Sequence, residues 1–290
     1  VAEALASILK AYFGSISDSK ARRSIFVVFG YNLSAFCKVL PGFWQMISVV
    51  VVARLGDRLG KAIRTAPRDA LLAAYSAADS QGRVFGFHRA MDTFGAALGP
   101  ALAIIYLWFR PGHYAELFLV AFAPSCISSL LTFFVKDPVE LVATESRLSF
   151  FAAQVSCLRQ GGASFRRLLL AVALFAIVNS SDVFLIMKAR EAGLSDTSAI
   201  GAYVFYNLIY AALAYPLGWL SDRIGKKKAY VSGLLVYSLS YMGFASTGSA
   251  LAIWISFALY GFYAAATESI VKAWVAEICP VELRGSSFGL

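Results

Sequence analysis

Long apolar runs separated by short polar segments dominate this chain. A helix needs about 20 apolar residues to cross a bilayer, and runs of that order recur from one end of the sequence to the other. They predict an all-α membrane protein with nine helices, over residues 1–16, 24–41, 43–72, 85–108, 114–135, 167–187, 198–220, 229–247 and 250–276.

The longest polar connection between these runs covers residues 136–166 and includes Glu140, Glu145, Arg147 and Arg159. Because every other connection is shorter, this segment predicts a linker between two helical bundles. The expected organisation is therefore an N-terminal bundle at 1–135, a cytoplasmic linker at 136–166 and a C-terminal bundle at 167–290.

Composition supports a membrane protein. The chain is 59% hydrophobic and 15% charged, with a mean hydropathy of +0.68, whereas soluble domains carry about 25% charged residues. Its net charge of +9 comes from short basic clusters between the apolar runs, which is how cytoplasmic loops are marked. Nucleic-acid binding is therefore disfavoured, and alternating loops, such as 20–23 and 223–228, are expected on the cytoplasmic side.

The chain shows no sign of enzyme or metal chemistry. Its four cysteines, at positions 37, 126, 157 and 279, are scattered and form neither a CxxC pair nor a Cys/His ligand spacing. No nucleophile–base pair is visible. We therefore expect no metal, no cofactor and no catalytic residue.

The predicted helix at 43–72 begins with apolar residues and then carries a charged stripe. On an ideal helix its charged side chains fall within an arc of about 140°, with Leu and Ala on the opposite side. Arg68 and Asp69 are expected at the membrane interface, where long side chains reach lipid headgroups. With both of these counted, five cations and two acids leave the stripe at +3. This charge predicts a pathway for an anionic substrate, although acids of other helices could instead neutralise the stripe. The predicted pathway residues are Arg54, Asp57, Arg58, Lys61 and Arg64.

An internal repeat relates the two parts of the chain. Gly14-Ser-Ile-Ser-Asp18 recurs as Gly218-Trp-Leu-Ser-Asp222, an offset of 204 (218 − 14), and Gly82-Arg-Val-Phe-Gly86 recurs as Gly285-Ser-Ser-Phe-Gly289, an offset of 203 (285 − 82). Two anchors with nearly one offset predict two homologous halves in parallel orientation around a central site, a known plan of transporters.

The repeat also predicts how many helices each half has. The C-terminal half starts near Arg166, earlier than the repeat of residue 1, and the N-terminal helices 85–108 and 114–135 lack partners before Leu290. We expect six helices per half, so that this chain is a fragment without the first helix and the last two.

These motifs resemble those of the major facilitator superfamily (MFS) over essentially the whole chain. The loops after the first and seventh predicted helices resemble its signature loop in each half, and Gly95, Gly99 and Pro100 resemble the fifth-helix motif frequent in its proton-coupled exporters. The resemblance implies two six-helix bundles with pseudo-two-fold symmetry. It also implies that the loop motifs gate transport, although a solvated loop that only sets topology is the alternative. The loop residues are Gly14, Asp18, Arg22, Arg23, Gly218, Asp222, Arg223 and Gly225.

The glycines of the fifth-helix motif, Gly95 and Gly99, stand at i,i+4, and Pro100 follows them. Small residues at this spacing allow close helix packing, and proline bends a helix. A packing role is therefore expected here rather than direct coupling.

Four titratable residues inside apolar helices are candidates for proton coupling. His88 and Asp92 are one helical turn apart, Asp182 lies among apolar residues, and Glu268 precedes Lys272 by four positions. Ionisable groups inside a membrane mark proton relays or ion pathways. A structural ion pair is the alternative for His88–Asp92 and for Glu268–Lys272.

The sequence therefore predicts a secondary active transporter, for example an antiporter, that moves a small solute by alternating access. Two further hypotheses are that the solute is anionic and that its export is coupled to protons. A membrane receptor or scaffold on the same fold, or a channel, is the alternative. Expected partners are the small-molecule substrate, the lipid bilayer and protons, and the expected state is a monomer in a bacterial inner membrane. The sequence identifies neither the substrate nor the direction of transport.

Overall fold

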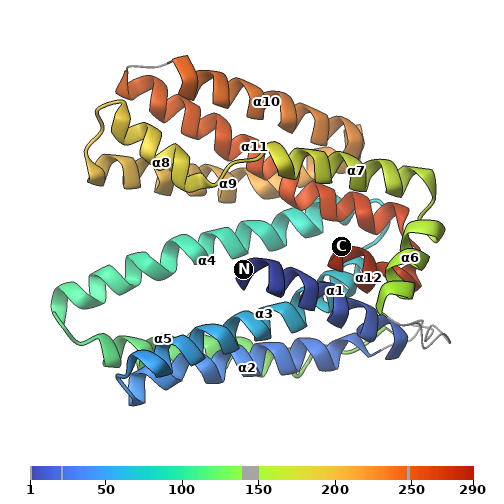
Figure 1. Ribbon diagram of the computed structural model, residues 1–290, viewed down its shortest axis with the longest axis horizontal. Helices are drawn as coiled ribbons and strands as arrows, with labels where there is room; N and C mark the ends of the chain where they lie inside the picture. The colour runs from blue at the N-terminus through green and yellow to red at the C-terminus, as the bar shows by residue number, and fades with distance from the viewer. Residues whose placement is uncertain (1, 21, 139–149, 247–248) are drawn as a thin grey trace. The chain divides into compact units, whose positions relative to one another are not determined.

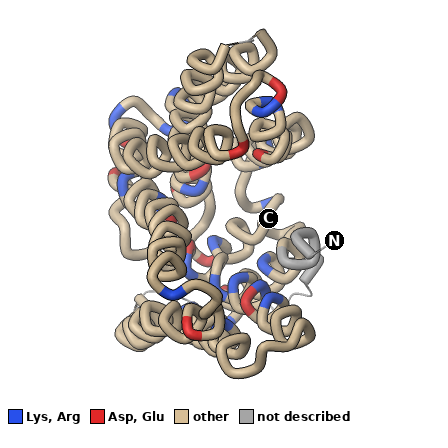
Figure 2. The backbone as a smooth tube through the Cα atoms, turned by 90° about the vertical axis from the view of Figure 1, so that its left-hand side faces the viewer, with Lys and Arg blue, Asp and Glu red and all other residues tan. Residues whose placement is uncertain are grey.

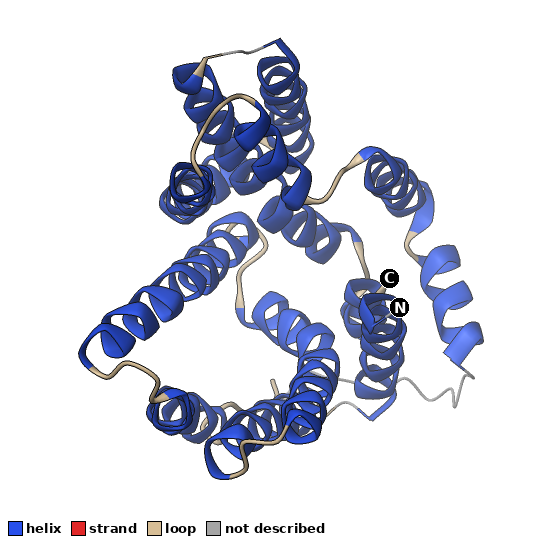
Figure 3. Cartoon of the chain, turned by 60° about the vertical axis from the view of Figure 1, so that its left-hand side comes forward, coloured by secondary structure: helices blue, strands red, loops and turns tan. Residues whose placement is uncertain are grey.

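The computed structural model describes residues 2–20, 22–138, 150–246 and 249–290. Every regular element in these ranges is a helix, and none of them contains a strand (Figures 1 and 3). The all-α prediction is confirmed. Acidic and basic residues beyond 138 in the predicted linker, Glu140, Glu145 and Arg147, lie outside the described residues.

Eight of the predicted helices are present with bounds shifted by a few residues. They are α1 (Ala2–Lys20), α2 (Arg23–Phe43), α3 (Ile47–Tyr75), α4 (Gln81–Phe109), α5 (Tyr114–Thr132), α9 (Asp196–Ile224), α10 (Lys226–Ser246) and α11 (Ala250–Ile278). Figure 1 shows most of them as long rods, as the length of their apolar runs requires.

The predicted count of nine helices is wrong. The helix expected at 167–187 is two helices, α7 (Gly162–Val178) and α8 (Asp182–Glu191), and the chain also forms α6 (Phe150–Gln160), a 3-10 turn η1 (Val281–Leu283) and α12 (Arg284–Gly289). The break between α7 and α8 falls on Asn179-Ser180-Ser181. Short polar side chains compete for backbone hydrogen bonds and favour caps, and Ser181 is the N-cap of α8.

Six helical stretches of the described chain are long and apolar enough to cross a membrane, with 162–191 counted as one. The other three predicted spans, α1, α3 and α10, do not meet that standard. Charge explains this for α3, which carries the stripe. In α10, tyrosine, serine and glycine residues between the apolar ones lower the hydropathy.

The structure forms two compact units, each assembled from separate parts of the chain. Unit 1 contains Val1–Tyr75, Leu102–Phe165 and Ile278–Leu290, and unit 2 contains Ser76–Ala101 and Arg166–Glu277. Helix α4 is shared, because its last residues belong to unit 1. The predicted bundle bounds at 135 and 167 remain a prediction.

In unit 1, α3 packs on α2 and α1, and α12 packs on α1 and α3. Small residues bring α2 and α3 together. A Cβ on Gly60 would lie 2.5 Å from the Ser34 hydroxyl and 2.7 Å from the Gly30 carbonyl, and one on Gly56 would lie 2.2 Å from the Cys37 sulfur. Such close backbone approach is how membrane helices gain van der Waals contact.

In unit 2, a core of apolar and tyrosine side chains joins α8, α9, α10 and α11. Its tyrosine rings lie in one contiguous cluster, with ring centroids as close as 4.4 Å for Tyr237 and Tyr241. Aromatic rings pack well in such offset and tilted arrangements. Each phenol also brings a hydroxyl that needs a polar partner inside the unit.

Candidate transport pathway and gating contacts

The charged stripe lies on α3 in unit 1. Arg54, Arg58 and Lys61 are exposed there, and none of them takes part in the ion pairs found between described residues. Asp57 is half-buried, and the Lys38 ammonium of α2 lies 3.7 Å from its carboxylate. Figure 2 shows Lys and Arg within helices as well as at their ends. The pairing of Asp57 leaves three cationic side chains on this face.

Further along α3, the basic residues bind partners within the unit. The Arg64 guanidinium lies 4.0 Å from the centre of the Tyr31 ring, a cation–π contact. Arg68 donates two hydrogen bonds to Asp69, at 2.9 and 3.1 Å, and Asp69 is fully buried. Arg68 and Asp69 therefore form an internal pair, and their position at the membrane interface stays a prediction.

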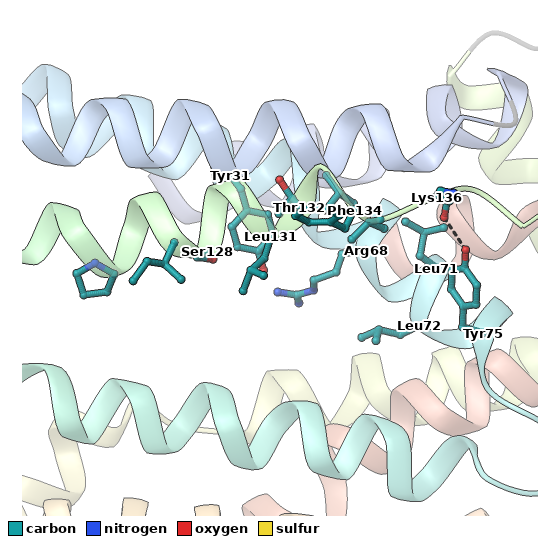
Figure 4. Close-up of a pocket in the computed structure, with 14 residues that line it drawn as sticks. Tyr31, Arg68, Leu71, Leu72, Tyr75, Ser128, Leu131, Thr132, Phe134 and Lys136 are labelled. Atoms are coloured by element: carbon teal, nitrogen blue, oxygen red, sulfur yellow. Dashed lines mark hydrogen bonds between the residues drawn. The ribbon is translucent and has the colours of Figure 1, made fainter.

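A cavity of about 830 Å³ opens in unit 1 between α2, α3 and α5. Figure 4 shows the Arg68 side chain extending toward it, with Leu131 and Thr132 nearby and Tyr75 bonded to the Lys136 carbonyl. The wall is apolar apart from a few hydroxyls and the basic residues Arg68 and Lys136. The charged stripe thus continues into an apolar cavity.

The first loop motif forms a buried contact that we name the Asp18 clamp. The Asp18 carboxylate accepts hydrogen bonds from the backbone amides of Gly285 (3.0 Å) and Ser286 (2.7 Å), from the Ser286 hydroxyl (2.9 Å) and from Arg23 (2.8 Å). The amides belong to the start of α12, where helical N–H groups lack internal partners and attract negative charge. Arg23 also donates to the Val281 carbonyl at 2.8 Å.

The second loop motif forms the equivalent contact in unit 2, the Asp222 clamp. Asp222 accepts from the amides of Gly82 (2.7 Å) and Arg83 (2.9 Å) at the start of α4, and from the Lys226 ammonium (2.8 Å). Lys226 also lies 3.5 Å from Glu277. Each clamp therefore joins a loop from one predicted half to a helix start from the other.

Glycines allow both clamps to close. A Cβ on Gly14 would lie 2.2 Å from the Gly285 carbonyl oxygen, and a Cβ on Gly218 would lie 2.3 Å from that of Gly82. Ser17 and Ser221 each donate to the carbonyl of the preceding glycine of the motif, at 2.7 and 2.6 Å. The two anchors of the sequence repeat are thus the two sides of one contact, formed twice.

The remaining loop residues lie at the rim of the clamps. Arg22 is exposed and precedes α2. Arg223 stacks on the Trp219 ring at 3.8 Å and, with Asp79, Arg83 and Asp222, lines a cavity of about 280 Å³. Gly225 ends α9 with φ +94°, a left-handed conformation that favours glycine.

Two acids of unit 2, Asp92 and Glu268, converge on Arg89 of α4, a residue that the sequence analysis missed. Its guanidinium bonds to Glu268 of α11 and to the Tyr210 hydroxyl of α9, and lies 3.3 Å from Asp92. Arg89 stands at i,i+3 from Asp92 inside an apolar helix, and that spacing is the signal that could have identified it. His88 is half-buried on the same helix.

Asp182 lies at the start of α8, next to the helix break. Its carboxylate accepts hydrogen bonds from Tyr260 (2.8 Å) and Tyr203 (3.4 Å). Of the ion pairs between described residues, none includes Asp182. Among the four candidates for proton coupling, this carboxylate is the one held by hydroxyl groups alone.

The close packing predicted at the fifth-helix motif stays a prediction. A Cβ placed on Gly95 or Gly99 would meet no described atom within 4 Å, and Pro100 lies inside α4 without ending it. The tight glycine contacts of this helix are at Gly82 and Gly86, which cross α9 at Gly218 and Ala214.

Several apolar helices long enough to span a bilayer, with charged groups inside them and a duplicated loop–helix contact, define a multi-pass membrane transporter. The sequence profile of the Major Facilitator Superfamily matches residues 2–290. The chain therefore belongs to this family of transporters, which are not enzymes.

Relatives by sequence agree. An uncharacterized MFS-type transporter of Methanocaldococcus jannaschii is 31% identical over 294 residues, covering 99% of this chain and 72% of that protein. An uncharacterized protein of Mycobacterium tuberculosis is 24% identical over 293 residues, covering 100% of this chain and 71% of its own length.

Solved structures share the fold. The outward-facing transporter FucP superposes with a TM-score of 0.73 at 13% identity, over 98% of this chain and 77% of that one. The human organic anion transporter MFSD10 superposes with a TM-score of 0.71 at 17% identity, over 98% of this chain and 71% of that one. The MFS-type fold is thereby confirmed.

Proposed function

We propose that this MFS transporter moves a small anionic solute by alternating access. The observation that carries the proposal is the face of α3 on which Arg54, Arg58 and Lys61 are exposed. Guanidinium groups bind carboxylate and phosphate in a two-point fork, and cations inside a membrane protein mark an ion or substrate path. The structurally similar MFSD10 is described as an organic anion transporter, which supports this choice of substrate class.

The Asp18 and Asp222 clamps are proposed to gate transport. Each is a charge-assisted contact between a loop and a helix start, and such a contact can hold one conformation and break in another. The basic loops beside both clamps favour a cytoplasmic position for them by the positive-inside rule. We propose that the clamps close that side of the transporter.

Protons are the proposed coupling ion. Glu268 and Asp92 each pair with the Arg89 guanidinium. Asp182 accepts hydrogen bonds from two hydroxyl groups and takes part in none of the ion pairs between described residues, so we propose it as the coupling acid. His88 stays a secondary candidate. The proposed direction of transport is export. The proposed transporter is a monomer in a bacterial inner membrane.

Counterflow in proteoliposomes tests the substrate class. Liposomes loaded with one anion of a library of carboxylates and phosphate esters should take up labelled anion against its gradient, and Arg58→Gln should lower that uptake at least about tenfold, the effect of losing one charge-assisted pair. Arg159→Gln, at an exposed position on α6, is the matched control. Unchanged uptake of every anion by Arg58→Gln contradicts the anionic assignment.

The same liposomes test the alternatives. A channel gives flux that follows the gradient without saturation or counterflow, and a receptor or scaffold binds ligand without flux. Proton coupling predicts that a pH gradient drives uptake and that Asp182→Asn removes this dependence. Transport that ignores the pH gradient in the unmodified protein contradicts the proposed coupling.

A further inference from the structure

Two buried cysteines meet at α12, behind the Asp18 clamp. Cys157 lies on α6 and is 1% exposed, and Cys279 directly follows α11 and is 5% exposed. Both are free thiols. The Cys157 sulfur lies 2.9 Å from the Ser287 hydroxyl of α12, and the Cys279 thiol bonds to the same hydroxyl. Two cysteines that are 122 positions apart (279 − 157) are therefore held around one oxygen atom.

The shared hydroxyl brings the two sulfurs close to each other. Ser287 donates its own proton to the Leu283 carbonyl at 2.8 Å, so both thiols donate to the lone pairs of its oxygen. Two sulfurs on one oxygen are separated by no more than about two sulfur–oxygen contacts. A disulfide has its sulfurs about 2 Å and its Cβ atoms about 4 Å apart, which rotation of the two side chains and a small shift of α6 can provide. All these residues belong to unit 1.

The docked position of α6 carries an energetic cost. Gln154, one turn before Cys157, is buried, and neither its amide oxygen nor its amide nitrogen makes a hydrogen bond among the described residues. A buried amide without partners destabilises the state that buries it. Helix α6 is only eleven residues long and packs on α1 and α12. We expect it to leave this surface more often than the long helices leave theirs, and its departure exposes both thiols to water.

We infer that Cys157 and Cys279 form a reversible disulfide that fastens α6 to α12 and holds the Asp18 clamp closed. The co-reactant is a small-molecule disulfide. With α6 undocked, the Cys157 thiolate attacks one sulfur of that disulfide, and the other half leaves as a thiolate that takes up a proton. When α6 docks again, the Cys279 thiolate attacks the Cys157 sulfur, and the second small thiol leaves. Two protein thiols are oxidised, and one small disulfide is reduced to two thiols.

The link acts on the clamp through α12. Asp18 accepts from the amides of Gly285 and Ser286, and the next residue, Ser287, is where both cysteines bond. Because α6 packs on both α1 and α12, fastening it to α12 disfavours states in which α12 leaves α1, as a cross-link restricts the open ensemble more than the closed one. The effect on transport rests on the proposed gating role, whereas the link and the clamp can be measured without transport.

Peptide mapping tests the pairing. Purified protein is incubated with oxidised glutathione at about pH 8, alkylated with maleimide in denaturant and digested without reduction. We expect one linked pair of peptides, containing Cys157 and Cys279, with Cys37 and Cys126 alkylated. Cys157→Ser and Cys279→Ser should each abolish the link and leave glutathione on the remaining cysteine. Cys126→Ser, outside this contact, is the matched control and should keep the link. The absence of the linked pair from the unmodified protein overturns the inference.

Two further measurements test the route and the lock. Gln154→Leu removes the buried amide, so α6 should undock less often and the link should form at least about fivefold more slowly; an equal rate contradicts undocking as the route. Deuterium exchange at 285–289 should slow at least about tenfold in the oxidised protein and recover with dithiothreitol. A link that leaves this exchange unchanged overturns the lock. A link that slows exchange but not transport supports the lock and contradicts only the gating role proposed above.

Discussion

The two clamps have the same design but differ in how deeply they are built into the protein. Asp18 is 4% exposed and accepts four hydrogen bonds, one of them from Arg23, which is 1% exposed. Asp222 accepts three, its partner Lys226 has a second acid within 3.5 Å, and a cavity of about 280 Å³ lies beside it. The two copies of the repeat thus form one fully buried contact, the Asp18 clamp, and one beside a cavity, the Asp222 clamp.

This difference means that two equivalent motifs need not contribute equally to the stability of the closed state. A buried pair is strongly destabilised when one partner is removed, because the other charge stays behind without compensation. The Asp222–Lys226 pair is buried as well, with side chains 7% and 6% exposed, but Lys226 keeps Glu277 as a second acid, so the loss of Asp222 leaves less charge uncompensated. We therefore expect the Asp222 clamp to open first and the Asp18 clamp to limit opening.

The largest predicted effect is the loss of Asp18. Asp18→Ala leaves Arg23 buried without its carboxylate and should cost about 3–5 kcal/mol, whereas Asp222→Ala should cost about 1–3 kcal/mol, because Lys226 keeps Glu277. Thermal unfolding of the purified variants in detergent measures the difference. Equal losses in the two variants would remove the basis for calling the clamps unequal.

Removal of the cationic partners should reproduce this order at smaller size. Arg23→Ala deprives Asp18 of its buried counterion but leaves two amides and a hydroxyl on it, so we expect about 2–3 kcal/mol of destabilisation. Lys226→Ala should cost about 1 kcal/mol. Lys227→Ala, at the next position and exposed, is the control. A larger loss for Lys226→Ala than for Arg23→Ala contradicts the comparison.

Glycine substitutions test whether both clamps depend on close approach. Gly14→Ala and Gly218→Ala each place a methyl group within 2.3 Å of a backbone oxygen, which forces backbone shifts that cost about 1–3 kcal/mol. Gly95→Ala meets nothing within 4 Å and should be neutral or stabilising by up to about 1 kcal/mol. If Gly95→Ala destabilises as much as Gly14→Ala, close backbone approach at Gly14 and Gly218 is not what makes the clamps sensitive to substitution.

Thiol reactivity provides the finest comparison, because only the Asp18 clamp has cysteines behind it. The Cys157 sulfur lies 2.9 Å from the hydroxyl of Ser287 on α12, and burial raises the pKa of Cys279 to about 11. The thiolate is the reactive form, so alkylation of Cys279 should be slow at pH 7.5 and rise about tenfold per pH unit up to that pKa.

Opening the Asp18 clamp should expose both thiols. Maleimide labelling at pH 7.5, read by mass spectrometry of the peptides that contain Cys157 and Cys279, should accelerate in Asp18→Ala and stay unchanged in Asp222→Ala. Acceleration in both variants would mean that the two clamps open together.

The sequence predicted the long helices from its apolar runs and the clamp residues from its internal repeat. Apolar runs located the long helices, because about 20 such residues need a bilayer or a core. The repeat located the residues of both clamps. It could not show that Gly14 meets Gly285, since contacts between residues some 270 positions apart depend on how helices pack and not on any local period.

The misses have physical causes as well. The break at Asn179–Ser181 is set by three short polar residues within an apolar run, and a count of hydrophobic residues passes over it. The sequence analysis paired Asp92 with His88 at i,i+4 and overlooked Arg89, which lies between them. The structure shows that Asp92 and Glu268 both pair with Arg89. A Cβ on Gly95 or Gly99 would meet no described atom within 4 Å, so the packing role of this motif stays a prediction.

Hydrogen exchange of the two helix starts tests the inequality of the clamps most directly. The amides of Gly285 and Ser286 are held by Asp18, and those of Gly82 and Arg83 by Asp222. Amides that open less often exchange more slowly. Mass spectrometry of deuterated peptides covering 82–86 and 285–289 should therefore show exchange at least about tenfold slower at 285–289, a free-energy difference of about 1.4 kcal/mol. Equal rates, or slower exchange at 82–86, would contradict the account.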